Sequence, residues 1–248
     1  MKISIITATY NSAATVRDTL ECIRRQSHAD IEHIIVDGRS SDKTLEIVSS
    51  YPHVAKIISE KDKGIYDAMN KGIGMATGEI IGILNSDDMY TDETVLSDVE
   101  GSFSGPEVKA AYADLQYVHP ADPNKVIRTW KAGAFHKRNF YYGWMPPHPT
   151  FFVRKEVYEQ AGVFDINLRS AADYELMLRI LLKHGIPASY IPRVIVRMRA
   201  GGMSNASFWN RIRANKEDRM AWKLNDLEPY FFTLYMKPLR KIPQFIFK

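Results

Sequence analysis

The chain has 248 residues, of which 45% are hydrophobic and 25% are charged, as in ordinary globular proteins. This length suits one α/β domain, alone or with a short appendage. The single cysteine, Cys22, excludes an internal disulfide and fits a reducing compartment. The first residues do not form a signal-peptide pattern, and no stretch approaches the roughly 20 apolar residues of a membrane span.

The formal net charge is +4, and the excess lies in residues 229–248. Beyond Glu228 there are four basic residues and no acidic residue, so the rest of the chain is close to neutral. Phenylalanine and tyrosine residues lie among these cations. This distribution argues against a general nucleic-acid surface and indicates a localised basic patch.

Apolar stretches of strand length alternate with helical patterns through the first ninety or so residues. Such alternation is typical of a parallel sheet covered by helices, which places the chain in the α/β class. The expected strands are residues 2–9, 31–37, 56–59 and 79–84, and the expected helices are residues 13–23, 44–50 and 65–77.

The pattern is looser beyond residue 91. Residues 132–149 are aromatic, rich in proline and irregular, and residues 201–204 form a flexible loop that we interpret as a lid over the site. The expected strands here are residues 109–117, 126–130, 150–153 and 190–198, and the expected helices are residues 95–99, 155–161, 174–184 and 208–224.

The most informative stretch is residues 79–88, where an apolar strand ends in Asn85, Ser86, Asp87 and Asp88. In open α/β sheets, ligands bind just outside the carboxyl ends of the strands. Adjacent side chains on a strand point to opposite faces, so both carboxylates can serve one site only if the chain turns there, and Asn85 and Ser86 favour a turn. Two close carboxylates suit Mg²⁺ or Mn²⁺, which is usually held by one or two carboxylates together with substrate phosphates. The alternative is a solvated turn before a helix that is capped at Thr91.

Two other predicted strands also end in polar groups, Thr9-Tyr10-Asn11 and Asp37-Gly38. The three strand ends would line one crevice at the edge of the sheet. Neither the dinucleotide-binding G-x-G-x-x-G motif nor a P-loop is present. A phosphate group bound in this crevice would therefore be held by a metal, which favours Asp87 and Asp88 as ligands.

Six segments of the chain carry recognisable motifs. They are residues 4–11, 34–44, 62–72, 84–88, 148–154 and 172–176. Together they resemble family 2 glycosyltransferases, and residues 62–72 resemble the branch that builds bacterial surface polysaccharides. The similarity is dense over residues 1–90 and fades after about Ser204.

The resemblance implies a GT-A fold, with a single Rossmann-like, mostly parallel sheet flanked by helices, and transfer from a nucleotide-activated sugar with inversion. Asp37 would accept a hydrogen bond from the base, taken to be uracil. Asp87 would meet the ribose or the metal, and Asp88 would bind Mn²⁺ or Mg²⁺. Asn85 and Ser86 stand where many members carry carboxylates, so Asp88 is the better candidate for a direct ligand. The residues that would line the nucleotide pocket are Thr7, Thr9, Tyr10 and Asn11.

Asp173 would be the catalytic base. A sugar hydroxyl has a very high pKa, so a positioned carboxylate must take its proton as the new bond forms. Asp173 begins a predicted helix, whose dipole favours the ionised form. The alternative is a plain helix cap, a position for which Ser170 competes. Glu175 is a reserve candidate that is expected to be structural.

His148 lies between prolines, so its backbone is restrained, and it would contact donor phosphate, acceptor or metal unless it is purely structural. Trp144 and Tyr142 would stack on a sugar ring or pack in the core. Three lysines near the site would screen phosphate or remain solvated, namely Lys61, Lys63 and Lys71.

The expected partners are a nucleotide-sugar donor and a lipid-linked or oligosaccharide acceptor, in this branch commonly linked to polyprenyl diphosphate. We expect a glycosyltransferase domain in residues 1–207, with a nucleotide-binding half (1–90) and an acceptor half (91–207). Residues 208–248 would form a basic, aromatic, helical extension. That tail would bind the inner face of the bacterial cytoplasmic membrane, pack on the domain, or form a homodimer.

Two other functions compete with this interpretation. A sugar-nucleotide pyrophosphorylase would share the architecture, but it would need a glycine-rich phosphate loop after the first strand, where Thr9-Tyr10-Asn11-Ser12 stands. A nucleotide-sugar-binding or scaffold protein would bind without turnover. It would have no need of a base such as Asp173.

Overall fold

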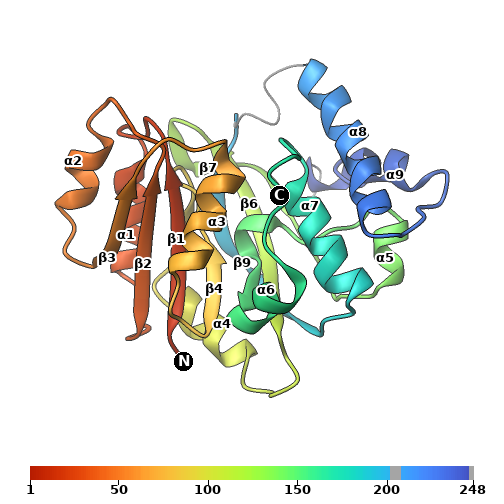
Figure 1. The fold of residues 1–248 in the computed structure, drawn as a ribbon, viewed down its shortest axis with the longest axis horizontal. Helices are drawn as coiled ribbons and strands as arrows, with labels where there is room; N and C mark the ends of the chain where they lie inside the picture. The colour runs from red at the N-terminus through yellow and green to blue at the C-terminus, as the bar shows by residue number, and fades with distance from the viewer. Residues whose placement is uncertain (202–207, 246–248) are drawn as a thin grey trace.

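The fold is that of a computed structural model, which describes residues 1–201 and 208–245. These residues form one nine-stranded sheet with helices packed around it (Figure 1). The strands are β1 (Ile3–Thr9), β2 (Ile31–Asp37), β3 (Val54–Ser59), β4 (Ile80–Ile83), β5 (Met89–Tyr90), β6 (Ala110–His119), β7 (Asp122–Trp130), β8 (Phe152–Arg154) and β9 (Ala188–Arg199).

The strand order is β3-β2-β1-β4-β8-β6-β9-β5, and β7 pairs with β6 outside this path. The first four strands in this order are parallel, as predicted. β8 then runs antiparallel to both β4 and β6, while β9 is parallel to β6. Because two reversals restore the original direction, the carboxyl ends of β1, β2, β4, β6 and β9 lie at the same edge of the sheet.

The central strands are apolar on both faces because helices or other strands cover both faces. Every residue of β1 and β4 is buried. Gly82 of β4 is needed for this packing, since a Cβ atom there would overlap the Phe152 ring of β8. The expectation of a strand buried on both faces before Asp87 is therefore confirmed.

The helices lie on both sides of the sheet, and α5, α7, α8 and α9 gather at the opposite end from α2 (Figure 1). α3 packs across β1 and β2. The helices are α1 (Val16–Arg24), α2 (Thr44–Ser49), α3 (Ile65–Met75), α4 (Val95–Ser102), α5 (Arg138–Tyr141), α6 (Lys155–Ala161), α7 (Ala172–Met177), α8 (Phe208–Leu224) and α9 (Thr233–Leu239).

The structure differs from the sequence prediction in several short elements. The helix expected over residues 174–184 begins at Ala172 and changes to a π-helix over Leu178–Lys183. Two elements were not predicted, β5 and the short α5 within the region expected to be irregular. The lid expected at residues 201–204 extends beyond the described residues, of which only Gly201 is included.

The C-terminal helices pack into the main core. Trp222 of α8 is fully buried and belongs to the same apolar cluster as Leu234 of α9 and Met177 of α7. Figure 1 shows α8 and α9 side by side next to α7. Within the described residues, no helix is long and apolar enough to cross a membrane.

Candidate active site

The shared edge of the sheet brings together side chains from five strands or the turns that follow them. β1 and β2 end in Thr9 and Asp37, and the turn after β4 carries Asp88. β6 places Tyr117 near its carboxyl end, and β9 ends in Arg199. Segments far apart in the sequence therefore converge where α/β proteins bind ligands.

Thr9 and Asp37 lie next to each other in the parallel ladder and are hydrogen-bonded, with Thr9 Oγ1 2.9 Å from Asp37 Oδ1. Ser40 donates from its backbone N–H and its hydroxyl, and Ser59 donates from its hydroxyl. Burial acts to raise the pKa of Asp37, but these hydrogen bonds outweigh it and lower the pKa. Asp37 is therefore an ionised carboxylate with four donors on its two oxygens. A base can bond to it only by replacing one of them.

The other residues predicted to line the nucleotide pocket have different surroundings. Thr7 is fully buried, and its hydroxyl lies 3.1 Å from Nε2 of His33 in the neighbouring strand β2. Asn11 adopts a positive φ of 49°, and its side-chain oxygen accepts from the Ser41 N–H at 2.9 Å, so it shapes the turn. Tyr10 is 68% exposed at the edge. Of these three, Tyr10 and Asn11 are exposed and can meet a ligand, whereas Thr7 presents no surface.

Asp87 and Asp88 lie in a turn that is held from two sides. Thr19 of α1 donates its hydroxyl to the Asp88 carbonyl at 2.7 Å, and Ser86 Oγ lies 2.8 Å from Ser12 Oγ. Asn85 Nδ2 donates to Asp88 Oδ2 at 3.2 Å. The turn thus lets both carboxylates belong to one edge, as the sequence analysis required.

Asp88 is fully buried, yet its Oδ1 atom has no hydrogen-bond partner. Burial, and then the neighbouring Asp87 carboxylate, raise the pKa of Asp88 well above its usual value. The Asn85 side-chain oxygen is also buried without a partner. Hard oxygen atoms that lack a donor fit a divalent cation, which would compensate the buried charge.

Among the described residues, no three histidine, cysteine, aspartate or glutamate side chains come together as a possible metal cluster. His148 is accordingly not brought into one ligand set with Asp87 and Asp88. Its ring instead packs edge-on against Phe164, with ring centroids 5.6 Å apart, and burial lowers its pKa. A metal at this turn would take its remaining ligands from substrate phosphate or water.

Asp173 lies in the first turn of α7, and its Oδ1 accepts from the Tyr66 hydroxyl at 3.3 Å. Tyr66 comes from α3, in the segment of residues 62–72 singled out in the sequence. Burial, and then Asp173, raise the pKa of Tyr66 well above its usual value, so Tyr66 remains a donor. The negative charge of Asp173 acts to raise the pKa of His148, against the larger effect of burial.

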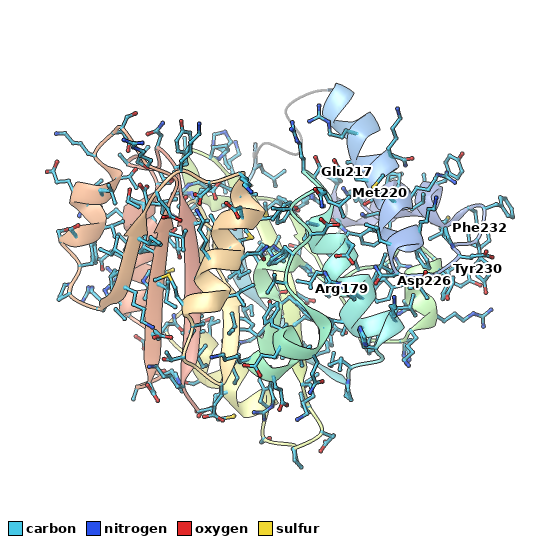
Figure 2. All side chains as sticks on the ribbon, in the orientation of Figure 1. Arg179, Glu217, Met220, Asp226, Tyr230 and Phe232 are labelled. Carbon is cyan, nitrogen blue, oxygen red and sulfur yellow. The ribbon has the colours of Figure 1, made fainter. Side chains whose placement is uncertain are left out.

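The loop before Asp173 is held by a residue that the sequence analysis did not single out. Glu217 of α8 accepts hydrogen bonds from the backbone N–H groups of Ser170, at 2.6 Å, and Ala171, at 3.1 Å. Figure 2 shows Glu217 on the part of α8 that lies next to α7. The expected cap, Ser170, does not cap α7 with its side chain. No local pattern links Glu217 to Asp173, because they lie on different helices.

Arg199 was also missed, although a cation at the end of a predicted strand was a usable signal. It is 8% exposed, and its guanidinium donates to the Asp87 carbonyl at 3.1 Å. It also forms an ion pair with Asp18 of α1 at 2.5 Å. Arg199 is thus the buried cation that lies against the Asp87–Asp88 turn.

Several candidates have structural roles instead. Trp144 is buried and donates to the Ala132 carbonyl at 2.7 Å, and Tyr142 packs against Phe232. Glu175 is buried and pairs with Arg179 at 2.7 Å, in agreement with the structural role expected for it.

Of the three lysines, Lys71 is neutralised by its neighbours. It pairs with Asp62 and, at 2.8 Å, with Glu60. Its charge is therefore already compensated by the protein, which argues against a role in screening phosphate.

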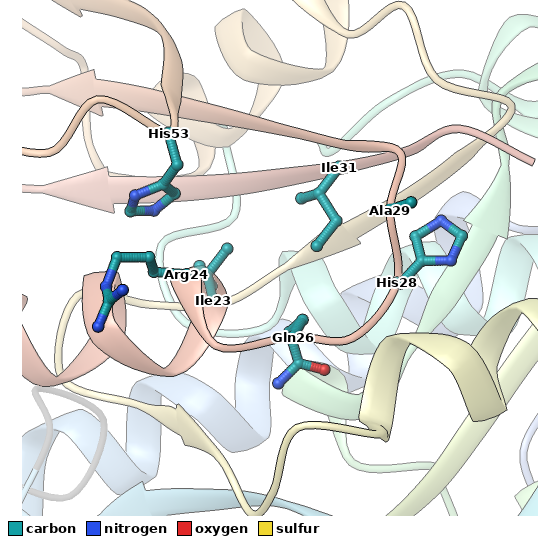
Figure 3. A pocket seen from close by; sticks show the side chains of 7 residues that line it. All are labelled: Ile23, Arg24, Gln26, His28, Ala29, Ile31 and His53. Atoms are coloured by element: carbon teal, nitrogen blue, oxygen red, sulfur yellow. The ribbon is translucent and has the colours of Figure 1, made fainter.

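A hollow of about 190 Å³ lies at the opposite edge, beside the amino ends of β2 and β3 (Figure 3). His28 and Gln26, which line it, already bond to the Met1 and Cys22 carbonyls. Most of its polar groups are therefore occupied, and it is separate from the carboxyl-end site.

The comparisons with known proteins identify the relatives of this chain. The family described as Glycosyl transferase family 2 matches residues 4–161. A PGL/p-HBAD biosynthesis glycosyltransferase of Mycobacterium bovis is 30% identical over 207 residues, covering 82% of this chain and 78% of the relative. An uncharacterized glycosyltransferase of Mycobacterium tuberculosis is 31% identical over 183 residues, covering 73% of this chain and 69% of the relative.

Solved structures share the fold at low sequence identity. S. aureus TarS 1–349 in complex with UDP-GlcNAc is 18% identical, with a TM-score of 0.71, over 98% of this chain and 73% of that one. The chain spans only 43% of the longer TarS chain. The mannosyltransferase PcManGT from Pyrobaculum calidifontis, in complex with GDP-Man and Mn²⁺, is 20% identical, with a TM-score of 0.68, over 98% of this chain and 70% of that one.

Proposed function

The chain belongs to glycosyl transferase family 2 and has the expected GT-A fold, and on this basis we propose that it transfers a sugar from a UDP-linked donor with inversion. The acceptor would be a sugar hydroxyl on a polyprenyl-diphosphate-linked glycan of a bacterial surface polysaccharide. The observation that carries the proposal is that the chain has two distinct candidate carboxylates. Asp88 has a buried oxygen without a hydrogen-bond partner, and Asp173 lies in the helix α7. The UDP-GlcNAc complex of TarS supports the choice of donor nucleotide.

Asp173 is proposed to take the proton of the attacking hydroxyl. Inversion requires the nucleophile to arrive on the face opposite the leaving group, so its base would lie across the site from the diphosphate. Asp173 is the candidate because it lies in α7, far along the chain from the Asp88 turn. The Tyr66 hydroxyl orients the carboxylate through Oδ1.

Asp88, with Asp87, is proposed to hold Mn²⁺ or Mg²⁺. When bound, the cation supplies compensation for the charge that develops on the departing nucleoside diphosphate. Asn85 orients Asp88 through Oδ2, which leaves Oδ1 available. Arg199 fixes the backbone of Asp87, and its own charge is compensated by Asp18. The Mn²⁺ of PcManGT, a protein of the same fold, supports this assignment.

Donor hydrolysis tests the proposal directly. UDP-, GDP- and dTDP-sugars would be incubated with the protein in Mn²⁺ or in EDTA, with D88A and D173N alongside. We expect slow hydrolysis of one UDP-sugar that stops in EDTA and in D88A. Donor binding without turnover, even with a lipid-linked acceptor present, would instead identify a binding or scaffold protein. Turnover that needs UTP and a sugar phosphate would identify a pyrophosphorylase.

We also propose that the C-terminal segment binds the inner face of the cytoplasmic membrane. Phe231, Tyr235, Leu239 and Ile242 recur at helical spacing on and around α9, and they are 89%, 65%, 52% and 57% exposed. The opposite side of α9 packs on the domain through Leu234. An exposed apolar stripe among basic residues suits an anionic bilayer interface.

Sedimentation with vesicles that contain anionic lipid tests the membrane proposal. We expect the wild type to bind and the triple variant F231S/Y235S/L239S to remain in solution. I166S is the matched control, because Ile166 is an exposed apolar residue outside the tail. Equal binding by the triple variant would contradict the proposal. If the triple variant instead lost a dimer, the stripe would be an interface between two copies.

A further inference from the structure

Arg128 of β7 is a buried cation. It is 7% exposed, and its Cζ lies 3.6 Å from the centroid of the Tyr117 ring and 5.5 Å from that of Phe245. One Nη donates to the Gln244 side-chain oxygen, in the turn that follows α9. The guanidinium therefore lies against aromatic rings and one neutral amide.

No carboxylate within the described parts of the chain pairs with Arg128. The other strongly buried guanidinium at this edge, Arg199, has Asp18 as its partner. Burial lowers the pKa of Arg128, and Tyr117 is the group that opposes this effect. A buried charge without a counterion is costly, and proteins normally pair such groups or use them to bind a ligand of opposite charge.

The position of Arg128 connects it with the proposed site. Arg128 pairs with Tyr117 in the β6–β7 ladder, near the carboxyl end of β6. Both Asp88 and Asp173 act electrostatically on Tyr117 and raise its pKa, after the larger effect of burial. Arg128 therefore lies beside the tyrosine that β6 contributes to the shared edge of the sheet, the edge that also carries the Asp88 turn.

We propose that Arg128 binds a phosphate group of the acceptor, in a subsite formed with Tyr117 and covered by Gln244. A guanidinium presents a planar set of N–H donors that matches phosphate oxygens, and its replacement by a neutral group removes that match. The acceptor is the favoured source because β7 belongs to the half of the chain that carries Asp173. The donor diphosphate would already be held at the Asp88 turn, through the cation proposed there.

This inference rests on the proposed function, since it assumes an acceptor that binds beside the donor. Its test is a binding measurement that does not depend on turnover. Geranyl diphosphate and geraniol would be titrated into the protein saturated with UDP and Mn²⁺, so that the donor site is filled. Parallel titrations of UDP alone would report on the donor site.

We expect the wild type to bind geranyl diphosphate at least about tenfold more tightly than geraniol, because hydrogen bonds between charged groups add roughly this much affinity. R128Q should lose this preference while it keeps its affinity for UDP. R138Q is the matched control, because Arg138 also lies over a tyrosine ring, Tyr142, but is exposed. Q244E should weaken geranyl diphosphate binding by placing a carboxylate beside Arg128, and it tests the idea even if R128Q fails to fold.

Three results would overturn the inference. They are an equal preference for the diphosphate in wild type and R128Q, competition between geranyl diphosphate and UDP for one site, and an unchanged affinity in Q244E. A protein that does not bind UDP would instead speak against the proposed donor, and the geranyl diphosphate titrations would still report on Arg128.

Discussion

Asp37 and Asp173 are carboxylates that the sequence singled out in the same way, but the structure holds them differently. Asp37 is held by near neighbours in the parallel ladder and in its own turn, including Thr9 and Ser40. Asp173 is bonded to Tyr66, more than one hundred residues away in the chain, and its loop is held by Glu217 of α8. The β1–β2 side of the site is therefore organised by adjacent strands and their turns, and the α7 side by contacts between distant helices.

This difference indicates where each side is vulnerable. The hydrogen bonds of the β1–β2 side join adjacent strands and their turns, so we expect this side to form together with the parallel ladder. The α7 side is complete only when α3 and α8 have packed against the loop at residues 170–173. We expect substitutions on the first side to act through binding and stability, and those on the second side to act on the rate of transfer.

The largest effect should come from D173N. If Asp173 is the base, its loss should lower kcat for transfer by about 10²–10⁴-fold, because the amide cannot accept the proton. The affinity for the UDP-sugar, measured by calorimetry, should stay within about twofold. Equal losses of kcat and of donor affinity would show that Asp173 belongs to the donor side. The proposed difference between the two sides of the site would then be wrong.

D88N should lower kcat by roughly 10²-fold or more, since the charge compensation of a bound cation contributes several kcal/mol. Without metal, the same variant should unfold at a higher temperature than the wild type. The raised pKa of Asp88 means that folding disfavours its ionised form. Stability is therefore lost as pH rises above the usual pKa of an aspartate and through the raised folded-state pKa, and a neutral amide avoids this cost. Thermal melts with and without Mn²⁺ measure both effects, and Mn²⁺ should stabilise the wild type only.

E217A should lower kcat about tenfold with little change in the KM for donor, because two backbone N–H groups before Asp173 lose their acceptor. E217Q should recover part of the rate, since an amide oxygen can still accept. D226A is the control, as Asp226 pairs with the exposed Lys183 and does not touch the loop. A change in the thermal melt without any change in kcat would assign Glu217 a role in stability alone.

The last effect is on stability rather than on rate, and it concerns the β1–β2 side. His33 is fully buried, and burial, with His53 beside it, lowers its pKa to about 3. The unfolded chain binds a proton below about pH 6.5. Stability should therefore be complete above pH 6.5 and decline as pH falls toward 3, by up to about 1.4 kcal/mol per pH unit for this group.

Urea unfolding at pH 7.5, 6.0 and 5.0 measures this slope. In H33Q the slope should be shallower than in the wild type, because one titrating group is gone. H28Q is the control, since His28 bonds to the Met1 carbonyl near the surface of the same region. An identical slope in H33Q would show that other histidines, such as His53, account for the pH dependence.

Much of the fold followed from the sequence alone. The strands and helices of the first ninety residues were predicted because their apolar spacing reflects the burial of each element, which is a local property. The same spacing predicted the strand before Asp87, and the run of Asn85 to Asp88 predicted the turn. The π-helix after α7 and the two-residue β5 were not predicted, since their hydrogen bonds depend on packing against other elements.

The sequence by itself also determined the family, through motifs that each lie within a few consecutive residues. Only the tertiary structure decided which residues hold those motifs in place. The two antiparallel steps through β8 bring β6 and β9 to the same edge as β4, and so carry Tyr117, Arg128 and Arg199 to the site. The chemistry of each side chain can be read directly from the amino-acid sequence. Which distant segments lie close together is decided by how the strands and helices pack.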